Sequence, residues 1–213
     1  MKKPNKKIAV IGLGYVGLPL ALSFAEKYTT IGYDQSKERI KELDLGYDKN
    51  KEVNKSELKK STIKFSNLDN DLFNCNYFII CVPTPVFKNK KINLRNIINA
   101  TRLVKKYINV GSTVIYESTV YPGCTEEVCL PILQKSGLKY NEDFYLGYSP
   151  ERINPGDKEH NIKNITKIVS GSNNIALNKI EKLYSSIIKA KTFRANSIKI
   201  AEAAKAIENT QRD

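Results

Sequence analysis

A glycine-rich segment near the start of the chain has the residue types and spacing needed to bind the pyrophosphate of a dinucleotide. Gly12, Gly14 and Gly17 form a GxGxxG pattern between an apolar run and a stretch with helical periodicity. Gly12 permits a tight turn, Gly14 lets the backbone approach the pyrophosphate, and Gly17 allows the helix to pack closely on the strand. The first helical turn supplies N–H groups and about half a positive charge to the phosphates. The pattern therefore predicts a phosphate-binding turn.

Asp34 ends the next apolar run, 22 residues after Gly12. A carboxylate at this place accepts hydrogen bonds from the adenosine ribose, and it repels a 2′-phosphate, so it favours NAD over NADP. The alternative is a glycine-rich turn in an unrelated α/β protein. The strand-to-helix context and the placed acid favour dinucleotide binding.

Further polar residues follow other apolar runs. Pro83-Thr84-Pro85 leaves the run Tyr77–Val82, and we expect it to line the nicotinamide or adenosine channel; a plain strand stop is the alternative. In a helical stretch near the end of the chain, Lys205 and Asn209 are four residues apart and therefore share a face. The full set of residues that we expect to contact the cofactor is Gly12, Gly14, Tyr15, Val16, Gly17, Asp34, Arg39, Pro83, Thr84, Ser118 and Thr119.

Strand-length and helix-length segments alternate along the chain, which predicts an α/β fold. Such alternation is typical of a doubly wound parallel (Rossmann) sheet with helices on both faces, whose ligands lie at the carboxyl ends of the strands. Residues 47–61 show no clear period and are expected to form a surface excursion. The expected strands are 7–11, 29–33, 62–65, 77–82, 112–117, 144–148, 166–170 and 191–193. The expected helices are 16–27, 37–45, 94–108, 123–136, 174–188 and one that begins at Ser197.

The composition is that of an ordinary globular protein with a basic surface. The 213 residues carry 35 basic and 22 acidic side chains, a net charge of +13. The lysines are scattered between apolar positions, so they indicate a solvated surface rather than a nucleic-acid interface, with some attraction for anionic small molecules. No apolar stretch approaches a membrane span, and the N-terminal run lacks the features of a signal peptide. We expect a cytoplasmic protein.

The cysteines and the histidine do not form a metal-binding pattern. Cys75, Cys81, Cys124 and Cys129 have no paired CxxC spacing, and His160 is the only histidine. We therefore expect no metal site, and four scattered thiols suit a reducing cytoplasm. His160 lies in a polar loop, where a surface or loop-structure role is expected rather than one in hydride chemistry.

Five motifs together resemble the UDP-sugar 6-dehydrogenases. They are GLGYVGLPLA at 12–21, CVPTP at 81–85, ESTVYPG at 117–123, YSPERINPGDKEH at 148–160 and AEAAKAIENTQRD at 201–213. These enzymes oxidise the 6-hydroxyl of a nucleotide sugar to a carboxylate with two NAD. The SPERINPGDKEH version is most similar to the UDP-N-acetylglucosamine and UDP-N-acetylgalactosamine 6-dehydrogenases of capsular and O-antigen polysaccharide synthesis.

The resemblance implies catalytic roles for four residues. Thr119 would help to hold a water near the reacting carbon, and Glu151 would act with that water in general acid–base chemistry. Lys205 and Asn209 would face the reacting centre and stabilise an oxyanion. The alternatives are a capped turn for Thr119, an ion pair with a neighbour such as Arg152 for Glu151, and a solvated surface for Lys205. The UDP-glucose branch has a second glutamate where this chain has Pro155, and this departure fits the N-acetylhexosamine branch.

The resemblance covers only the N-terminal half of the family's proteins. It implies that residues 1–196 form the NAD-binding domain and that 197–213 begin a connecting helix, which builds a homodimer in the full-length protein. It also implies that the UDP-sugar domain and the thioester-forming cysteine follow Asp213, so that the chain alone is inactive. A non-enzymatic NAD-binding module and another hydroxyl dehydrogenase with the same Rossmann start are the alternatives.

Overall fold

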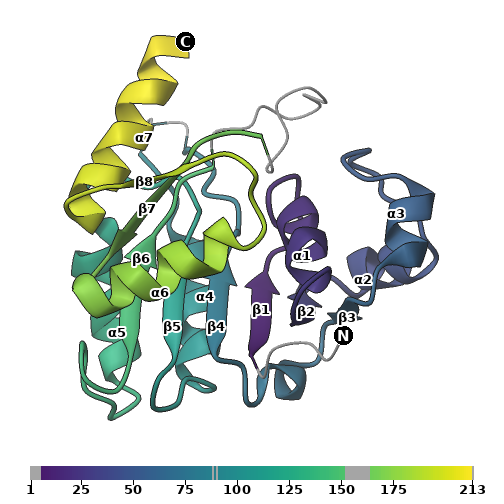
Figure 1. Cartoon of the computed structure of the whole chain (residues 1–213), viewed down its shortest axis with the longest axis horizontal. Helices are drawn as coiled ribbons and strands as arrows, with labels where there is room; N and C mark the ends of the chain where they lie inside the picture. The colour runs from purple at the N-terminus through teal and green to yellow at the C-terminus, as the bar shows by residue number, and fades with distance from the viewer. Residues whose placement is uncertain (1–5, 88, 90, 152–163, 213) are drawn as a thin grey trace.

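The computed structural model describes residues 6–87, 89, 91–151 and 164–212. Within them, helices and strands alternate along most of the chain (Figure 1). The strands are β1 (Lys7–Ile11), β2 (Thr29–Tyr33), β3 (Lys64–Ser66), β4 (Tyr77–Ile80), β5 (Thr113–Tyr116), β6 (Tyr145–Tyr148), β7 (Lys167–Gly171) and β8 (Thr192–Arg194). The helices are α1 (Gly17–Ala25), α2 (Lys37–Asp44), α3 (Lys55–Lys60), α4 (Arg95–Lys105), α5 (Leu130–Gln134), α6 (Asn174–Ser185) and α7 (Ile198–Arg212). Two short turns complete them, the 3₁₀ turn η1 (Asp69–Leu72) and the π-helical turn η2 (Thr125–Cys129).

The strands form one sheet in the order β3-β2-β1-β4-β5-β6-β7-β8. Neighbouring strands from β3 to β6 are parallel, and the strand order reverses between β1 and β4. Ligands of doubly wound sheets bind at such a reversal, outside the carboxyl ends of the strands. The predicted fold class is therefore confirmed, and its topology places the binding crevice next to Gly12.

β7 runs antiparallel to β6, a feature that the alternating pattern did not predict. β8 is parallel to β7, so the last two strands run against the other six. The reversal brings the start of β7 toward the carboxyl end of β6. Lys167, the first residue of β7, thereby lies at the edge where the ligand crevice opens.

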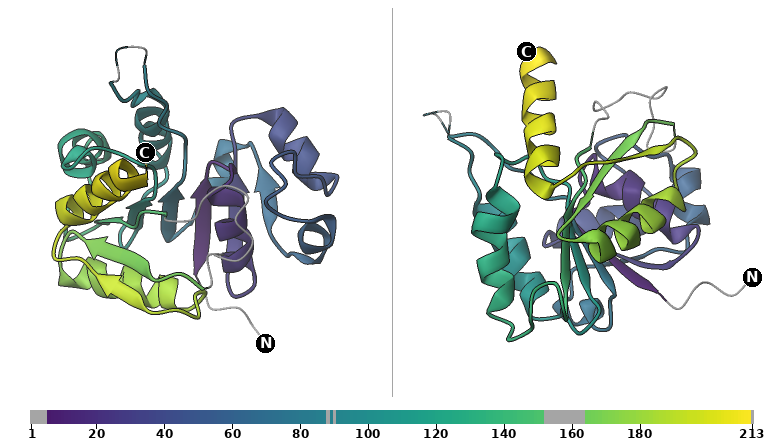
Figure 2. Two further views of the ribbon diagram at one scale, coloured as in Figure 1. Left: turned by 90° about the horizontal axis from the view of Figure 1, so that it is seen from above. Right: turned by 60° about the vertical axis from the view of Figure 1, so that its left-hand side comes forward.

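The core consists of two apolar layers, one on each face of the sheet. Alternate residues of β1 enter opposite layers: Ala9 and Ile11 pack with α4, α5 and α7, whereas Ile8 and Val10 pack with α1, α2 and α6. The right-hand view of Figure 2 shows helices on both faces and α7 rising beyond the sheet. No helix within the described residues has both the length and the apolar character that a membrane span needs.

Two segments differ from the elements expected from the sequence. The surface excursion at 47–61 contains α3, whose capping box has Asn54 accepting from the Glu57 amide while the Glu57 carboxylate accepts from the Asn54 amide. The helix expected at 123–136 begins with the π-helical turn η2 before α5. Both departures come from local backbone hydrogen bonding that the apolar periodicity does not reveal.

Candidate functional site

The glycine turn after β1 has the geometry that a dinucleotide requires. Gly12 has φ +93°, a left-handed conformation that favours glycine, and its N–H donates to the Tyr33 carbonyl at 2.8 Å. A Cβ on Gly17 would lie 1.8 Å from the Gly12 carbonyl oxygen, so only glycine fits at this contact between strand and helix. A Cβ on Gly14 would meet no atom within 4 Å, which leaves room for a phosphate against the backbone. The turn therefore fits the pyrophosphate of NAD.

Asp34 lies directly beside this turn. Its Oδ2 accepts from the Leu13 amide at 2.9 Å, and its Oδ1 accepts from the Ser36 amide, also at 2.9 Å. A carboxylate has about four acceptor positions, so these two bonds fix its orientation and leave acceptor capacity for ribose hydroxyls. The half-buried acid thus connects the ends of β1 and β2 at the edge of the crevice.

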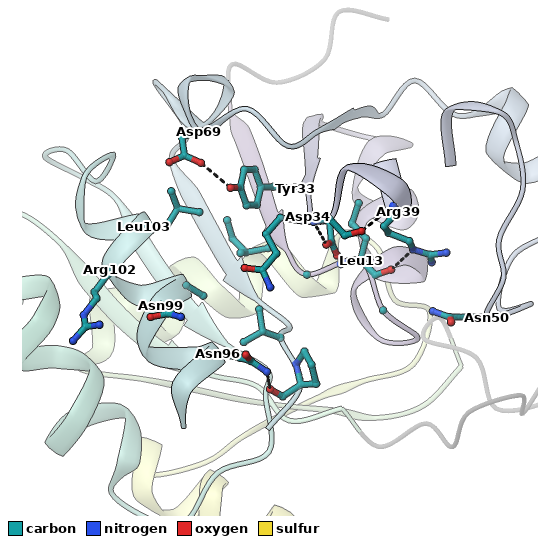
Figure 3. Close-up of a pocket in the computed structure, with 18 of the residues that line it drawn as sticks. Leu13, Tyr33, Asp34, Arg39, Asn50, Asp69, Asn96, Asn99, Arg102 and Leu103 are labelled. Carbon is teal, nitrogen blue, oxygen red and sulfur yellow. Dashed lines mark hydrogen bonds between the residues drawn. The ribbon is translucent and has the colours of Figure 1, made fainter. Parts of the chain in front are cut away.

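A cavity of about 570 Å³ opens beside Asp34 between the glycine turn and α4 (Figure 3). Figure 3 shows Asp34 and Arg39 on one side and Asn96, Asn99 and Arg102 of α4 on the other. The α4 residues were not predicted, although their spacing of three marks a polar helix face that follows a strand end. The size and polar lining of this cavity suit the adenosine part of a dinucleotide.

Arg39 lines the same cavity, but protein groups engage its guanidinium. Nε donates to the Leu13 carbonyl at 2.9 Å, while the terminal nitrogens lie 2.6 Å from Glu42 Oε1 and 2.7 Å from Asp48 Oδ1. The Asp48 carboxylate also accepts from the amides of Asn50 and Glu52. Arg39 therefore connects the glycine turn to the segment before α3, and its predicted contact with the cofactor stays a prediction.

A second cavity, of about 980 Å³, lies beside the first and collects the four predicted catalytic residues. They come from the end of β5 (Thr119), the end of β6 (Glu151) and one face of α7 (Lys205 and Asn209). The remaining predicted cofactor contacts among its lining residues are Gly14, Tyr15, Val16, Pro83, Thr84 and Ser118. The two cavities share Gly14, so a molecule bound along the glycine turn can extend from one into the other.

Two hydroxyls connect the loops that follow β4 and β5. The Thr84 hydroxyl donates to the Thr119 carbonyl at 2.6 Å, and the Ser118 hydroxyl donates to the Val82 carbonyl at 2.7 Å. Pro83 and Thr84 therefore form part of the cavity wall rather than only ending a strand. The half-buried Thr119 lies where its side chain can reach the cavity.

Within the described part of the chain, Glu151 forms an ion pair with Lys167. The Lys167 ammonium lies 3.0 Å from Glu151 Oε2 and 2.8 Å from Glu117 Oε2, and all three residues are buried. Neither Glu117 nor Lys167 was predicted as a site residue. A lysine within an expected strand, as Lys167 is, could have indicated a buried charge that needs a partner. Arg152, Pro155 and His160 lie outside the described residues.

Glu202 fixes the helix that carries Lys205 and Asn209. Its fully buried carboxylate accepts from the backbone amides of Gly123 at 2.5 Å and Thr125 at 2.9 Å. Burial raises the pKa of Glu202, and the hydrogen bonds from Thr125 and Gly123 oppose that rise. Lys205, one turn later, is only 8% exposed and lies 3.4 Å from Glu208 Oε2, so it is not a freely solvated lysine.

The four cysteines are buried free thiols. Burial raises the pKa of the Cys75 thiol to about 11. Cys81 lines the second cavity, but burial, together with the charge of Glu117, raises the pKa of its thiol well above the ordinary value. Among the described residues no group of three His, Cys, Asp or Glu side chains is arranged to hold a metal ion.

Comparison with protein families matches residues 6–188 to the UDP-glucose/GDP-mannose dehydrogenase family, NAD binding domain. The chain is 53% identical over 209 residues to the UDP-N-acetyl-D-glucosamine 6-dehydrogenase of Pseudomonas aeruginosa, covering 97% of this chain and 50% of the relative. It is 50% identical to the protein CapL of Staphylococcus aureus, with 98% and 50% covered. The chain therefore spans about half the length of the curated relatives it matches.

Solved structures show the same fold. The UDP-D-ManNAc dehydrogenase of Pyrococcus horikoshii superposes with a TM-score of 0.89 at 37% identity, covering 97% of this chain and 50% of that one. The dehydrogenase for NDP-N-acetyl-D-galactosaminuronic acid from Methanosarcina mazei Go1 superposes with a TM-score of 0.90 at 30% identity, with 98% and 48% covered.

Proposed function

Because this chain belongs to the UDP-glucose/GDP-mannose dehydrogenase family, as its NAD-binding domain, we propose that it serves the oxidation of the 6-hydroxyl of a UDP-N-acetylhexosamine to a carboxylate. The observation that carries the proposal is the second cavity. It gathers Thr119, Glu151, Lys205 and Asn209 next to the glycine turn, although these residues come from three distant parts of the chain. The high identity to UDP-N-acetyl-D-glucosamine 6-dehydrogenases supports an N-acetylated sugar as the substrate.

NAD, when bound, accepts the hydride from the carbon that carries the hydroxyl. The proposed task of Lys205 and Asn209 is to stabilise the oxygen of that carbon as its proton leaves, because a cation and an amide placed at a developing oxyanion lower the barrier. Glu151 is proposed to take or deliver protons through a water that Thr119 helps to hold. The 8% exposure of both Lys205 and Glu151 supports these roles, since charges act more strongly where water is excluded.

The second oxidation, from aldehyde to acid, needs a tetrahedral adduct that can lose another hydride, and a thiolate is the usual nucleophile for it. The burial and raised pKa values of Cys75 and Cys81 argue against either thiol in that role. Cys124 and Cys129 are fully buried, and they do not line the second cavity. We therefore propose that the nucleophile comes from outside these 213 residues.

We also propose that the full-length protein is a cytoplasmic homodimer that uses α7. Ile200 and Ile207 are seven residues apart on this helix and are 51% and 60% exposed, which supports an apolar contact there. The four free thiols support a reducing compartment. Light scattering of a longer polypeptide from the same reading frame, with Ile207→Lys as the variant, tests the dimer: dissociation by the variant is expected.

The catalytic proposal is tested by NADH formation in that longer polypeptide. UDP-N-acetylglucosamine, UDP-N-acetylgalactosamine and UDP-glucose are the three substrates to compare. We expect NADH with at least one N-acetylated sugar, and its loss in Asn209→Ala with the affinity for NAD retained. Firm NAD binding with no oxidation of any of the sugars would refute the proposal and favour a non-enzymatic NAD-binding module.

A further inference from the structure

Behind Glu151 lies a cluster of buried ionisable side chains that the proposed chemistry does not use. Lys167 of β7 lies between Glu151 and Glu117, at 3.0 Å and 2.8 Å, and the Tyr184 hydroxyl of α6 donates to Glu117 Oε1. Lys167 and Glu117 are each 3% exposed and Tyr184 is fully buried. The four residues come from four segments that meet only in the folded chain.

Counting the described residues alone, the cluster holds more negative than positive charge. The Lys167 ammonium pairs with the carboxylates of both Glu117 and Glu151. It also lies 5.5 Å from the centroid of the Tyr184 ring. Burial by itself lowers the pKa of Lys167, but the charges of Glu117 and Glu151 outweigh it and raise that pKa above the ordinary value. Burial raises the pKa of Glu117, and the Lys167 charge opposes that rise. Lys167 therefore stays protonated at every physiological pH.

The position of the cluster relates it to the cavity. Glu151 and Glu117 line the second cavity, whereas Lys167 reaches them from β7 and Tyr184 anchors Glu117 from α6. A buried ammonium between two carboxylates restricts the rotamers of both, and it favours the ionised form of each. Removing the ammonium would leave two buried carboxylates without this shared cation, which favours protonation of one of them.

We propose that Lys167 is a positioning residue for Glu151: its ammonium, anchored by Glu117 and Tyr184, holds the Glu151 carboxylate ionised at the wall of the cavity. The proposal rests on the proposed function for its catalytic meaning, but the coupling between Lys167 and Glu151 is a property of this chain alone. It can therefore be measured without any substrate.

The test is the titration of the Glu151 carboxyl group by ¹³C NMR in the 213-residue chain, with Glu151→Gln to assign the signal. Among the described residues, the charged and titratable groups around Glu151 are Lys167 of β7, Glu117 at the end of β5, Tyr184 of α6, Cys81 after β4 and Lys205 of α7. Glu117→Gln removes the competing carboxylate and retains an acceptor for Tyr184. We expect the midpoint of the Glu151 titration to move to lower pH in this variant.

Adding Lys167→Met to Glu117→Gln should move the midpoint back to higher pH, above that of the unsubstituted chain. This double variant removes one positive and one negative charge, so the net charge of the cluster is the same as in the unsubstituted chain. Near-ultraviolet circular dichroism shows whether the double variant retains the native fold. Lys182→Met, an exposed lysine on α6, is the matched control and should leave the midpoint unchanged. The proposal is overturned if Glu117→Gln has the same Glu151 midpoint as the unsubstituted chain. It is also overturned if the folded double variant has the same midpoint as Glu117→Gln.

A second readout connects the cluster to catalysis. In the longer polypeptide, the double variant should lower kcat by about 100-fold while the affinity for NAD changes little, because misplacing a reacting group has an effect of this order. If the titration moves as expected but no variant or parent oxidises any UDP-sugar, the coupling stands and the proposed function fails. If the double variant keeps the parent kcat, Lys167 has no positioning role.

Discussion

The Glu202 carboxylate of α7 accepts a hydrogen bond at 2.5 Å from the backbone amide of Gly123, a residue 79 positions earlier in the chain. Gly123 has φ +98° and begins the segment that leads into η2. The contact therefore fixes the start of α7 against the loop that follows β5. Because Lys205 lies one helical turn after Glu202, the same contact decides that Lys205 faces the second cavity.

This contact makes the stability of the chain depend on pH in a defined direction. Burial raises the pKa of Glu202 above the 4.5 of a free glutamate. The contribution of this group to stability is therefore complete below about pH 4.5 and is lost as the pH rises through the raised value. Between the pKa of Glu202 in the unfolded chain and its raised pKa in the folded chain, the unfolding free energy of the parent falls by about 1.4 kcal/mol per pH unit relative to that of the uncharged variant Glu202→Gln.

Urea unfolding at pH values from 4 to 7.5 measures the effect. As the pH rises, the unfolding free energy of the parent should fall relative to that of Glu202→Gln. Glu142→Gln, whose side chain is 68% exposed in the parent, is the control with the same chemical change. A difference that stays constant over this range would show that Glu202 titrates as an ordinary glutamate.

Preference for NAD over NADP should depend on Asp34. Asp34→Ala is expected to weaken NAD binding by ~1–3 kcal/mol, because hydrogen bonds from the ribose hydroxyls to a charged acceptor are lost. The same variant should narrow the preference for NAD, since the carboxylate no longer repels a 2′-phosphate. Calorimetric titration with both dinucleotides measures this.

Asp69→Asn is the matched control for Asp34→Ala, because Asp69 lines the same cavity and accepts from the Tyr33 hydroxyl at 2.7 Å. It removes one negative charge from the cavity without touching the glycine turn. Equal affinity of the unsubstituted chain for NAD and NADP would contradict the role of Asp34, as would an equal effect of both variants.

In the longer polypeptide, Lys205→Ala should reduce turnover far more than it changes NAD affinity. Loss of one donor at a developing oxyanion costs ~100–1000-fold in rate. Lys199 lies on the same helix with its side chain 63% exposed, so Lys199→Ala is the control and should retain the parent rate. Initial rates with saturating NAD and UDP-sugar give the comparison, and a Lys205→Ala rate within a few-fold of the parent would place Lys205 outside the chemistry.

The 213-residue chain by itself should bind NAD and yet form no NADH with either UDP-N-acetylhexosamine. The cofactor cavities are built from its own residues, but we expect most of the contacts to the nucleotide sugar to lie outside them. Without a positioned sugar, the first hydride transfer loses ~7–11 kcal/mol of proximity contribution. Absorbance at the NADH band, with the longer polypeptide as positive control, provides the measurement. Steady NADH formation by the chain alone would contradict this prediction, and two NADH per sugar would in addition require a nucleophile among its four cysteines.

The glycine turn and Asp34 could be predicted from the sequence because their chemistry is local. A glycine spacing between a strand and a helix allows few backbone conformations, and the φ of Gly12 and the close approach at Gly17 confirm that interpretation. Parallel strands all end at the same edge of a sheet, so the edge at which the motifs meet was also predictable, whereas the strand order was not. Resemblance to a family, not periodicity, was what assigned Lys205 and Asn209.

The sequence analysis missed the short helix α3. This helix has only six residues, and the only sequence pattern that indicates it is the Asn54-to-Glu57 capping box within a polar stretch. The antiparallel direction of β7 was missed for a different reason, because the sequence of a five-residue strand has the same pattern whichever way the strand runs.

The buried charges were decided by the tertiary structure alone. The sequence by itself determined a Rossmann sheet with a dinucleotide turn, but nothing in it pairs Lys167 with Glu117, 50 residues away, or Glu202 with Gly123. A charge can be buried only where partners from other segments compensate its lost hydration. Those partners exist as neighbours only after the sheet has formed, so the identity of the cofactor turn was readable from the residues, whereas the orientation of Glu151 and Lys205 was not.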